Sequence, residues 1–461
     1  MRGHGILPAA ASLLLVVAAA RAADEKAGEE SPSRLSDEPI PLKTLDVPGR
    51  PASVLEIGDG FFHPGKIGDG FTLPTGAVWQ PSLLVFGTFR TGLGHLDRGG
   101  GAGIGEWANR LDLFVNLKLS ATERVLVGFR PLDENNRFSG YNFDPMDREV
   151  DGFNLDIRTA LFEGDFGEIF PKLDPQETKM LDFGFAVGRQ PFLFQDGILV
   201  NDTLDAFALV RNSLKPKGIS NLRSSFVVAW NEIHRGNNVE DDEATLLALF
   251  NEFDTHTSTV EVDLVGVLGS ATSGGGDALY FGAGATQRIG RFNTTFRFNL
   301  SAPLDGENPF VTRGALLFAE VSWVPHHTID NVYVNVFVGI DSFSSAARDP
   351  SAGGPLGRVG ILFAATGLGS AGAPVANRVG EDVGGAVGYQ WILDGGRRQV
   401  VLELAGRMDY NGAGTSEAAV GARFQQALRQ NYIVIVDGFV GYRELVSDAI
   451  WGVRLEFQVK F

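Results

Sequence analysis

The chain has 461 residues, a formal net charge of −17 and no cysteine. The absence of cysteine excludes disulfides, thiolate catalysis and cysteine-ligated metals, and the negative charge argues against nucleic acid as a partner. Hydrophobic residues make up 44% of the chain and charged residues 21%. This balance indicates neither a disordered chain nor a bundle of membrane helices.

The first 22 residues are predicted to be a secretory signal peptide. Arg2 supplies a positive start, the run from Ile6 to Ala20 is apolar, and Ala20-Arg21-Ala22 fits the small-x-small cleavage pattern. The apolar run is shorter than the roughly 20 residues that a spanning helix needs, which disfavours a membrane anchor. We therefore expect the mature chain to begin in the periplasm.

Residues 23–81 are predicted to be a periplasmic lead that could also plug a pore. Residues 23–52 are polar, charged and proline-bearing, as flexible segments are. The motif Ile57-Gly58-Asp59-Gly60-Phe61 recurs at residues 67–71, which indicates a compact loop. Residues 60–66 imitate a phosphate-binding loop, but Ile67 stands where that loop needs Ser or Thr.

From Ser82 to the C-terminus, apolar and polar residues alternate in segment after segment. Residues 111–119, 332–338 and 451–461 show the pattern clearly, with apolar side chains at every second position. Such alternation is typical of β-strands, and many segments are about 10 residues long, near the length a tilted strand needs to span a bilayer. The sequence predicts an all-β fold, a transmembrane antiparallel up-and-down β-barrel over residues 82–461. A soluble two-sheet sandwich is the alternative, but it would have to place charged faces around its whole surface.

The number of strands must be even if both ends of the mature chain lie in the periplasm. Roughly 19 windows alternate, and the weakest, Gly357–Gly367, is embedded in small residues. Treating Phe343–Asn377 as one long external loop leaves about 18 strands, with about 16 as the alternative. Leu132–Gly152 and Pro191–Thr203 are also expected to be external loops, whereas Phe166–Thr178 would be a long periplasmic exception.

The polar faces of the strands are expected to line a water-filled pore. Fixed charges at close quarters set which ions such a pore passes, and arginines outnumber carboxylates here, which predicts a constriction that favours anions. The alternative is that these charges pair across strands and hold the wall. By parity, the pore-lining residues are Arg90, Arg110, Asp112, Arg124, Arg130, Asp156, Arg158, Glu261, Asp263, Arg297, Glu403, Arg407, Arg423, Arg454 and Glu456.

Residues for catalysis or metal binding are few, and no cofactor is predicted. The sequence has no nucleophile-elbow or zinc-protease motif. The pair His326-His327 near Asp330 lacks a third ligand and indicates a polar turn rather than a metal site. The acidic stretches Asp133–Asp151 and Glu240–Glu243 do not have the spacing of a known calcium loop, which favours a solvated surface.

A short segment carries a family resemblance. Gly188-Arg189-Gln190, followed by Asp196-Gly197 and Leu204-Asp205-Ala206-Phe207, resembles the strand-loop-strand pattern of the alginate-export family of porins. The resemblance implies a barrel of about 18 strands whose arginine-rich lumen conducts a polyanionic polysaccharide. By parity Arg189 follows Val187 onto the outer face, so we expect it beyond the membrane edge or at a bulge.

The leading hypothesis is therefore an outer-membrane porin for anionic or carbohydrate solutes, with polysaccharide export as its more specific form. The terminal Phe461 looks like the assembly signal of bacterial outer-membrane proteins, so the expected partners are outer-membrane lipid, the barrel assembly machinery and the solutes, and no nucleic acid. One alternative is a barrel-embedded hydrolase, which needs a nucleophile beside a histidine on the wall. Another is a plugged barrel with a structural or adhesive role.

Overall fold

The computed structural model describes residues 51–58, 69–100, 103–176, 178–236, 238–269, 275–304 and 310–461. The predicted signal peptide and most of the predicted lead lie outside these residues. Among the described residues, no helix is long and apolar enough to cross a membrane. The short helices are α2 (Phe166–Ile169), η1 (Gln195–Gly197), η2 (Pro350–Ala352) and η3 (Asp394–Gly396).

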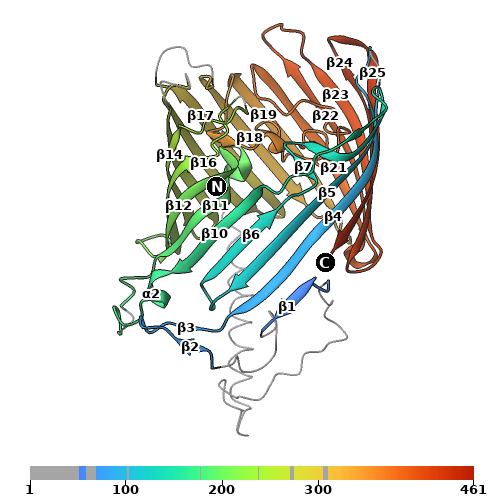
Figure 1. Ribbon diagram of the computed structural model, residues 1–461. Coiled ribbons are helices and arrows are strands. Elements are labelled where there is room, and N and C mark those ends of the chain that lie inside the picture. The colour runs from blue at the N-terminus through green and yellow to red at the C-terminus, as the bar shows by residue number, and fades with distance from the viewer. Residues whose placement is uncertain are drawn as a thin grey trace. The chain divides into compact units, whose positions relative to one another are not determined.

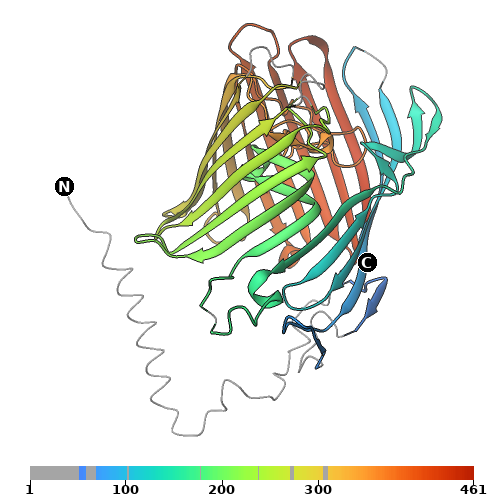
Figure 2. The same ribbon diagram turned by 60° about the vertical axis from the view of Figure 1, so that its left-hand side comes forward.

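Eighteen antiparallel strands form the wall of a closed barrel (Figures 1 and 2), which confirms the predicted fold class. The last strand pairs with the first, with Trp451 opposite Asp97, so the ring has no open edge. The wall strands are β4 (Ser82–Asp97), β5 (Ile104–Lys118), β6 (Arg124–Phe129), β10 (Ile157–Asp165), β11 (Gly184–Phe194), β12 (Val200–Leu214), β13 (Asn221–Asn231), β14 (Thr245–Asp254), β15 (Ser258–Leu268), β16 (Ala278–Ile289), β17 (Phe292–Pro303), β18 (Gly314–Trp323), β19 (Asn331–Asp341), β21 (Asp382–Leu393), β22 (Arg398–Asp409), β23 (Glu417–Ala427), β24 (Tyr432–Arg443) and β25 (Val446–Lys460).

The alternating sequence explains why these strands close into a barrel. On β22, Leu402 and Leu404 are 48% and 58% exposed on the outer face, whereas Glu403 between them is fully buried on the inner face. An apolar outer face belongs in lipid, where every backbone polar group must find a partner inside the protein. Closure of the ring satisfies this requirement, because each wall strand then has two neighbours.

The wall strand next to β5 is made of two pieces, β6 and β8 (Arg137–Asp144), separated by residues that leave the wall. β6 and β8 both pair with β5, with Phe129 opposite Leu113 and Ser139 opposite Asn109. The chain advances by ten residues from 129 to 139 while the partner moves by only four from 113 to 109, so six extra residues leave the wall. We call Arg130–Asn136 the inward turn.

The inward turn is built on a tight hairpin. β7 (Asp133–Glu134) pairs with the start of β8, and the two connecting residues, Asn135 and Asn136, have φ values of 50° and 67°. Two positive φ values are typical of a type I′ turn, and asparagine tolerates them. The prediction of an external loop over Leu132–Gly152 is therefore wrong, because this range holds β7, β8 and β9 (Arg148–Val150).

A second segment bends inward from the tops of β11 and β12. These strands pair with each other along their length, but β10 pairs with β11 only as far as Arg189, and β13 with β12 only as far as Asp205. Above that level β12 pairs instead with β20 (Ala347–Arg348). We call Gln190–Leu204 the inward hairpin. The predicted external loop Pro191–Thr203 makes up nearly all of this hairpin, so that prediction is also corrected.

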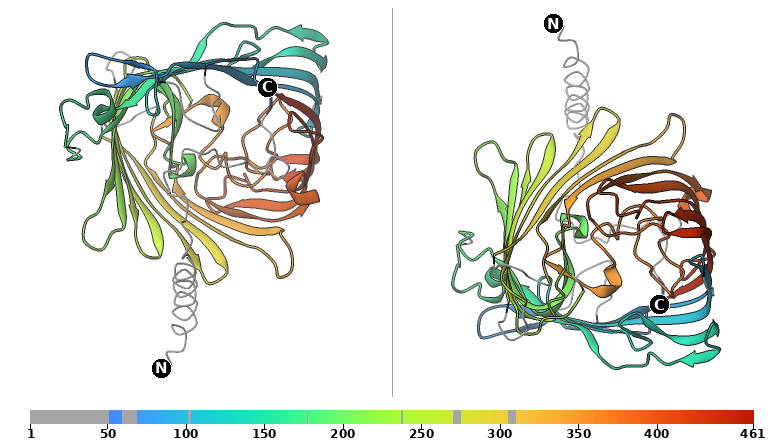
Figure 3. Two further views of the ribbon diagram at one scale, coloured as in Figure 1. Left: turned by 90° about the horizontal axis from the view of Figure 1, so that it is seen from below. Right: turned by 90° about the horizontal axis from the view of Figure 1, so that it is seen from above.

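A third segment, residues 342–381 between β19 and β21, lies inside the ring and is called the inner loop (Figure 3). Its side chains Leu356, Leu362 and Phe363 are at most 2% exposed and pack with the wall residues Leu316 and Phe337. The prediction of an external loop over 343–377 is wrong, because its scattered apolar residues bury themselves against the inner wall.

The described part of the predicted lead lies at the end of the barrel where β4 begins. β1 (Leu55–Ile57) pairs with the first residues of β4. β2 (Phe71–Thr72) and β3 (Val78–Trp79) form a small hairpin near α2 (Figure 1), where Lys172 donates a hydrogen bond to a carbonyl of the connecting turn at 2.8 Å. Residues 59–68 lie outside the described residues, so the plug stays a prediction.

Candidate pore constriction

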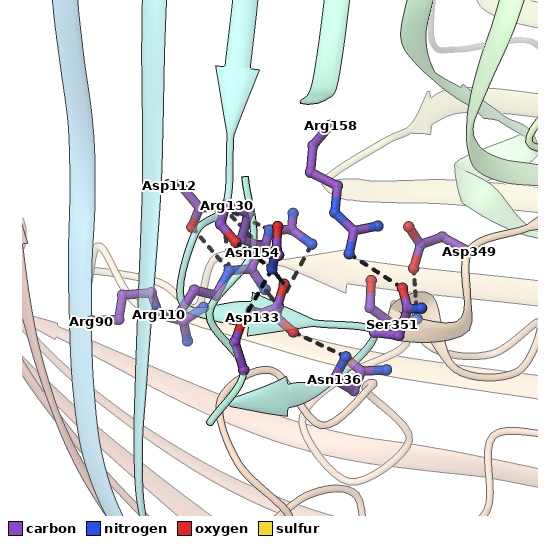
Figure 4. Close-up of polar contacts among 12 residues, drawn as sticks. Arg90, Arg110, Asp112, Arg130, Asp133, Asn136, Asn154, Arg158, Asp349 and Ser351 are labelled. Atoms are coloured by element: carbon purple, nitrogen blue, oxygen red, sulfur yellow. Dashed lines mark hydrogen bonds and ion pairs between the residues drawn. The ribbon is translucent and has the colours of Figure 1, made fainter. Parts of the chain in front are cut away.

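A charged cluster projects from β5 and the inward turn into the lumen (Figure 4). Asp112 lies between two guanidiniums, at 2.9 Å from Arg110 Nε and 3.0 Å from Arg130 Nε. Asp133 is almost fully buried at 3.8 and 3.7 Å from the same two arginines. A backbone N–H at Asn136 donates to Asp133 at 2.9 Å, which fixes the carboxylate within the turn.

Arg158 enters the lumen from the top of β10. Its Nη2 donates to Asn135 Oδ1 at 3.2 Å, and its Nε is buried without a hydrogen-bond partner among the described residues. A cavity of about 210 Å³ separates this side chain from the inner loop, where Asp349 forms part of the lining. We call this space the constriction cavity. Its lining also includes Arg130 and Arg189, so three arginines from three elements meet there.

Arg189 does not lie on the outer face, which corrects its predicted position. Gly188 has a φ of 115°, and a Cβ there would lie 2.1 Å from the carbonyl oxygen of Ala160, so only glycine fits this bend. Before the bend at Gly188, the face of β11 that carries Val187 points outward. After the bend, the same face, which carries Arg189, points into the lumen. Arg189 then binds Asp205 at 2.9 Å and Glu232 at 2.7 Å.

Three predicted pore-lining residues position the tip of the inward hairpin against the far wall. Arg297, whose side chain is 4% exposed, binds Glu261 and lies 2.8 Å from Asp196 at the tip. Asp263 accepts a hydrogen bond from Gln195 Nε2 at 2.6 Å. These residues hold the hairpin against the inner wall.

Three further predicted residues hold the inner loop. Glu403 is fully buried and accepts hydrogen bonds from the backbone N–H groups of Ile361 and Leu362 at 2.9 and 2.7 Å. Arg407 on the same strand and Arg454 on β25 donate to carbonyls of the same loop. The contacts are Arg407 with Ala376 at 2.9 Å and with Arg378 at 3.0 Å, and Arg454 with Thr366 at 3.2 Å and with Leu368 at 3.1 Å.

The remaining predicted residues are paired or lie away from the wall. Asp156 is exposed in the irregular segment before β10, which begins at Ile157, so it is not on a wall strand as its predicted pore-lining position requires. The pairs are Arg90 with Glu456 at 2.6 Å, Arg124 with Glu163 at 2.5 Å, and Arg423 with Asp437 at 2.5 Å.

Sequence reasoning missed several carboxylates of the lumen. Asp133 and Asp349 stand in stretches predicted to be external loops, and nothing in their local pattern indicates that those stretches fold inward. Asp437 could have been found, because it is a single acid within the apolar run Ile433–Val440 and shares its parity with other inward positions of β24. The arginine excess inferred from the strands is therefore largely neutralised.

A closed, even-stranded barrel with an apolar exterior and a charged interior defines a porin-type β-barrel of the bacterial outer membrane. Comparison of the sequence with protein-family models and with curated proteins finds no match.

Several solved structures share the fold. OccK2 (OpdF) of Pseudomonas aeruginosa aligns with a TM-score of 0.56 at 10% identity, over 82% of this chain and 97% of that one. OccAB4 of Acinetobacter baumannii gives 0.54 at 10% identity, over 84% and 100%. OccAB2 of the same organism gives 0.53 at 12% identity, over 82% and 98%. This similarity shows the barrel fold and does not extend to the alginate-export family.

Proposed function

We propose that the protein is a passive outer-membrane channel for small polar solutes, with a preference for anionic or carbohydrate solutes. The observation that carries the proposal is the narrowing of the lumen by the inward turn, the inward hairpin and the inner loop. A barrel of this many strands otherwise leaves a wide aqueous lumen. A charged cavity of about 210 Å³ lies among the three segments, and a second cavity of about 270 Å³ borders the inner loop.

The charge of one wall supports the preference for anions. In the cluster around Asp112, Arg110, Arg130 and Arg158 stand beside Asp112 and Asp133, so guanidiniums exceed carboxylates within that cluster, whereas Glu106 on the inner face of β5 is bound to Ser370 of the inner loop. A low-dielectric wall focuses the field of such a cluster into the lumen and raises the local concentration of anions. The acidic charge of loops outside the bilayer is screened by salt beyond about 8–10 Å.

The anchoring of the inserted segments favours small solutes over a polysaccharide chain. A polymer would have to displace the inner loop or the inward hairpin, and both are held by buried hydrogen bonds, such as those of Glu403 and Asp263. Polysaccharide export therefore has less support than passage of single sugars or small anions.

The hydrogen bonds around histidine disfavour a barrel-embedded hydrolase. Among the described residues, no hydrogen bond joins a histidine to a serine or threonine hydroxyl, the arrangement that activates such a nucleophile. His234, which borders the constriction cavity, instead has its Nδ1 at 3.0 Å from Asp202.

Conductance in planar bilayers tests the proposal. We expect discrete current steps, and in a KCl gradient a reversal potential that indicates preference for chloride. A folded barrel that carries no current would support the plugged barrel instead. A conducting channel that prefers potassium would leave the channel but remove the anion preference.

A further inference from the structure

The guanidinium of Arg158 has unused capacity for hydrogen bonding. It has five N–H donors, and within the described part of the chain its one hydrogen bond goes to Asn135. Its Nε is buried and has no partner, and no carboxylate forms an ion pair with it among the described residues. Because the side chain lines the constriction cavity, the N–H groups of its Nη atoms that have no partner are available to a solute there.

Asp349 faces the same cavity from the inner loop, and Figure 4 shows its carboxylate directed toward the side of Arg158. Its Oδ1 accepts a hydrogen bond from Ser351 N at 2.7 Å, and no ion pair of Asp349 occurs among the described residues. Burial alone would raise the pKa of Asp349, but the hydrogen bonds from Ser351 and the charges of His234 and Arg130 lower it below its ordinary value. The carboxylate is therefore ionised at neutral pH.

The other charges around the cavity already have opposite partners. The pairs are Asp112 with Arg130 at 3.0 Å, Arg189 with Glu232 at 2.7 Å, and His234 with Asp202 at 3.0 Å. Arg158 and Asp349 are thus a cation and an anion that face one cavity without an ion pair between them or with another residue of the described chain.

We propose that the constriction cavity binds dipolar solutes, small molecules that carry both a carboxylate and an ammonium group, between Arg158 and Asp349. A guanidinium binds a carboxylate through paired, charge-assisted hydrogen bonds, and Asp349 accepts from the ammonium. A simple anion would gain Arg158 but meet the like charge of Asp349, and a simple cation would have the opposite problem. This assignment rests on the proposed channel function and adds one class of solute, net-neutral dipolar molecules, to the anionic and carbohydrate solutes named there.

Three probes of nearly equal size separate these cases in single-channel recordings. β-Alanine carries both charges, propionate carries only the carboxylate, and propylamine carries only the ammonium. We expect β-alanine to interrupt the ion current at concentrations about tenfold lower than either of the others, because one charge-assisted hydrogen bond corresponds to about that factor. Equal or stronger interruption by propionate would overturn the assignment.

Two variants test the residues. Arg158→Gln keeps N–H donors, as an amide in place of the guanidinium, but removes the charge, so interruption by β-alanine and by propionate should weaken about tenfold and that by propylamine should strengthen. Asp349→Asn should strengthen propionate and weaken propylamine and β-alanine. General destabilisation of the barrel cannot produce opposite effects on two probes. Arg397→Gln, in an exposed turn, is the matched control and should leave all three responses unchanged.

The outcomes separate the two proposals. A folded wild-type protein that does not conduct refutes the channel function itself. A wild-type channel that conducts but does not distinguish the three probes refutes only the dipolar-solute site. Unchanged responses in both variants would also overturn the site.

Discussion

Arginine has two uses on the inner wall, and the exposure of the side chain separates them. Arg297 and Arg407 are 4% and 1% exposed and hold inserted segments through several bonds each. Arg110 and Arg130 are 16% and 22% exposed and reach the lumen. A buried guanidinium needs partners because burial of an unpaired charge is costly. The more exposed arginines are therefore the ones that can act on a passing ion.

The first prediction concerns these two arginines. Changing Arg110 and Arg130 together to serine leaves Asp112 and Asp133 without their cationic partners. The reversal potential in a KCl gradient should move toward cations, because two carboxylates then dominate the local field. Arg397→Ser, in an exposed periplasmic turn, should leave the potential unchanged. A double variant with wild-type selectivity would remove the inward turn from the selectivity mechanism.

The second prediction tests the lipid-facing register. Val420→Arg places a charge on the outer face of β23, where Val420 is 39% exposed opposite Val440 and Leu404. Arginine near the midplane of the bilayer costs about 2–4 kcal/mol, so assembly should be impaired. Gln425→Arg, on the inner face of the same strand, should assemble normally. Heat-modifiable migration on a gel measures both, and equal behaviour would contradict the register.

For single residues, the sequence predicted on which side of the wall a side chain lies better than it predicted which residue that side chain pairs with. Period-two alternation placed Arg90 and Glu456 on the inner face, and the structure pairs them at 2.6 Å. It could not predict that Asp133 joins Arg110 and Arg130, because that contact depends on six residues leaving the wall. Alternation describes the local backbone, whereas these pairs depend on tertiary structure.

Among the elements, the inner loop depends on one buried carboxylate. Glu403→Ala would leave the N–H groups of Ile361 and Leu362 without an acceptor, at about 1–3 kcal/mol for each buried group. We expect the wall to assemble while the loop loosens, which should raise the single-channel conductance and its noise. Tryptic cleavage at arginines of residues 342–381 should also become faster.

The control for this variant lies on the same strand. Gln399→Ala removes a hydrogen bond to Gln390 at 3.0 Å, away from the inner loop, so conductance and cleavage should match the wild type. If Glu403→Ala and Gln399→Ala behave alike, the carboxylate does not hold the loop.

The inward turn should be separable from the wall. Deleting residues 131–136 removes the six extra residues and lets β6 run into β8 in one register along β5. We expect the shortened barrel to show the gel migration of a folded barrel and to conduct more current, because a segment that narrows the lumen is gone. Unchanged conductance would show that the constriction lies elsewhere.

Alternation predicted the wall well and the inserted segments poorly, for a physical reason. A wall strand faces lipid on one side and the lumen on the other, which imposes a period of two. Residues 342–381 contact the inner wall irregularly, so their buried side chains, such as Leu356 and Phe363, follow no period. The predicted count of about 18 strands is confirmed, because the weakly alternating segment 357–367 is indeed not a wall strand. The predicted external position of this segment was wrong.

At the scale of the whole molecule, one junction joins two inserted segments to the wall. The backbone N–H of His234 donates to Asp202 of the inward hairpin at 2.9 Å. The carbonyl of His234 accepts from the backbone N–H of Arg348 in the inner loop at 2.9 Å. His234 also pairs with Glu240 as an isolated β-bridge. Loosening this junction would therefore affect both segments at once.

The junction should weaken as pH rises. Burial lowers the pKa of His234, but the hydrogen bond to Asp202 and the nearby carboxylates raise this pKa overall above its ordinary 6.5. The stability that protonated His234 contributes is therefore present below pH 6.5 and is lost as pH rises through the pKa of the folded state. Burial, with a hydrogen bond to Asp242 and the charge of Glu232, raises the pKa of Glu240 to about 7, so stability is also lost as pH rises from its ordinary 4.5 through that value.

Current noise measured at about pH 6 and about pH 9 tests this linkage. We expect more frequent fluctuations at the higher pH, and a weaker pH dependence in His234→Gln, which cannot titrate. Noise that is independent of pH in the wild type would argue against the junction as a support of the constriction.

The six residues that the inward turn adds to the wall limit how the length of this part of the chain can change in evolution. Because six is even, Tyr141 on the far side still stands opposite Trp107 on the lipid face. Loss or gain of a single residue in the turn would shift the register of β8 by one and exchange its two faces. Tyr141 and Phe143 would then face the lumen, and Asn142 would face the lipid. In evolution the turn should therefore lengthen or shorten by two residues at a time. The constriction can then change while the barrel wall stays the same.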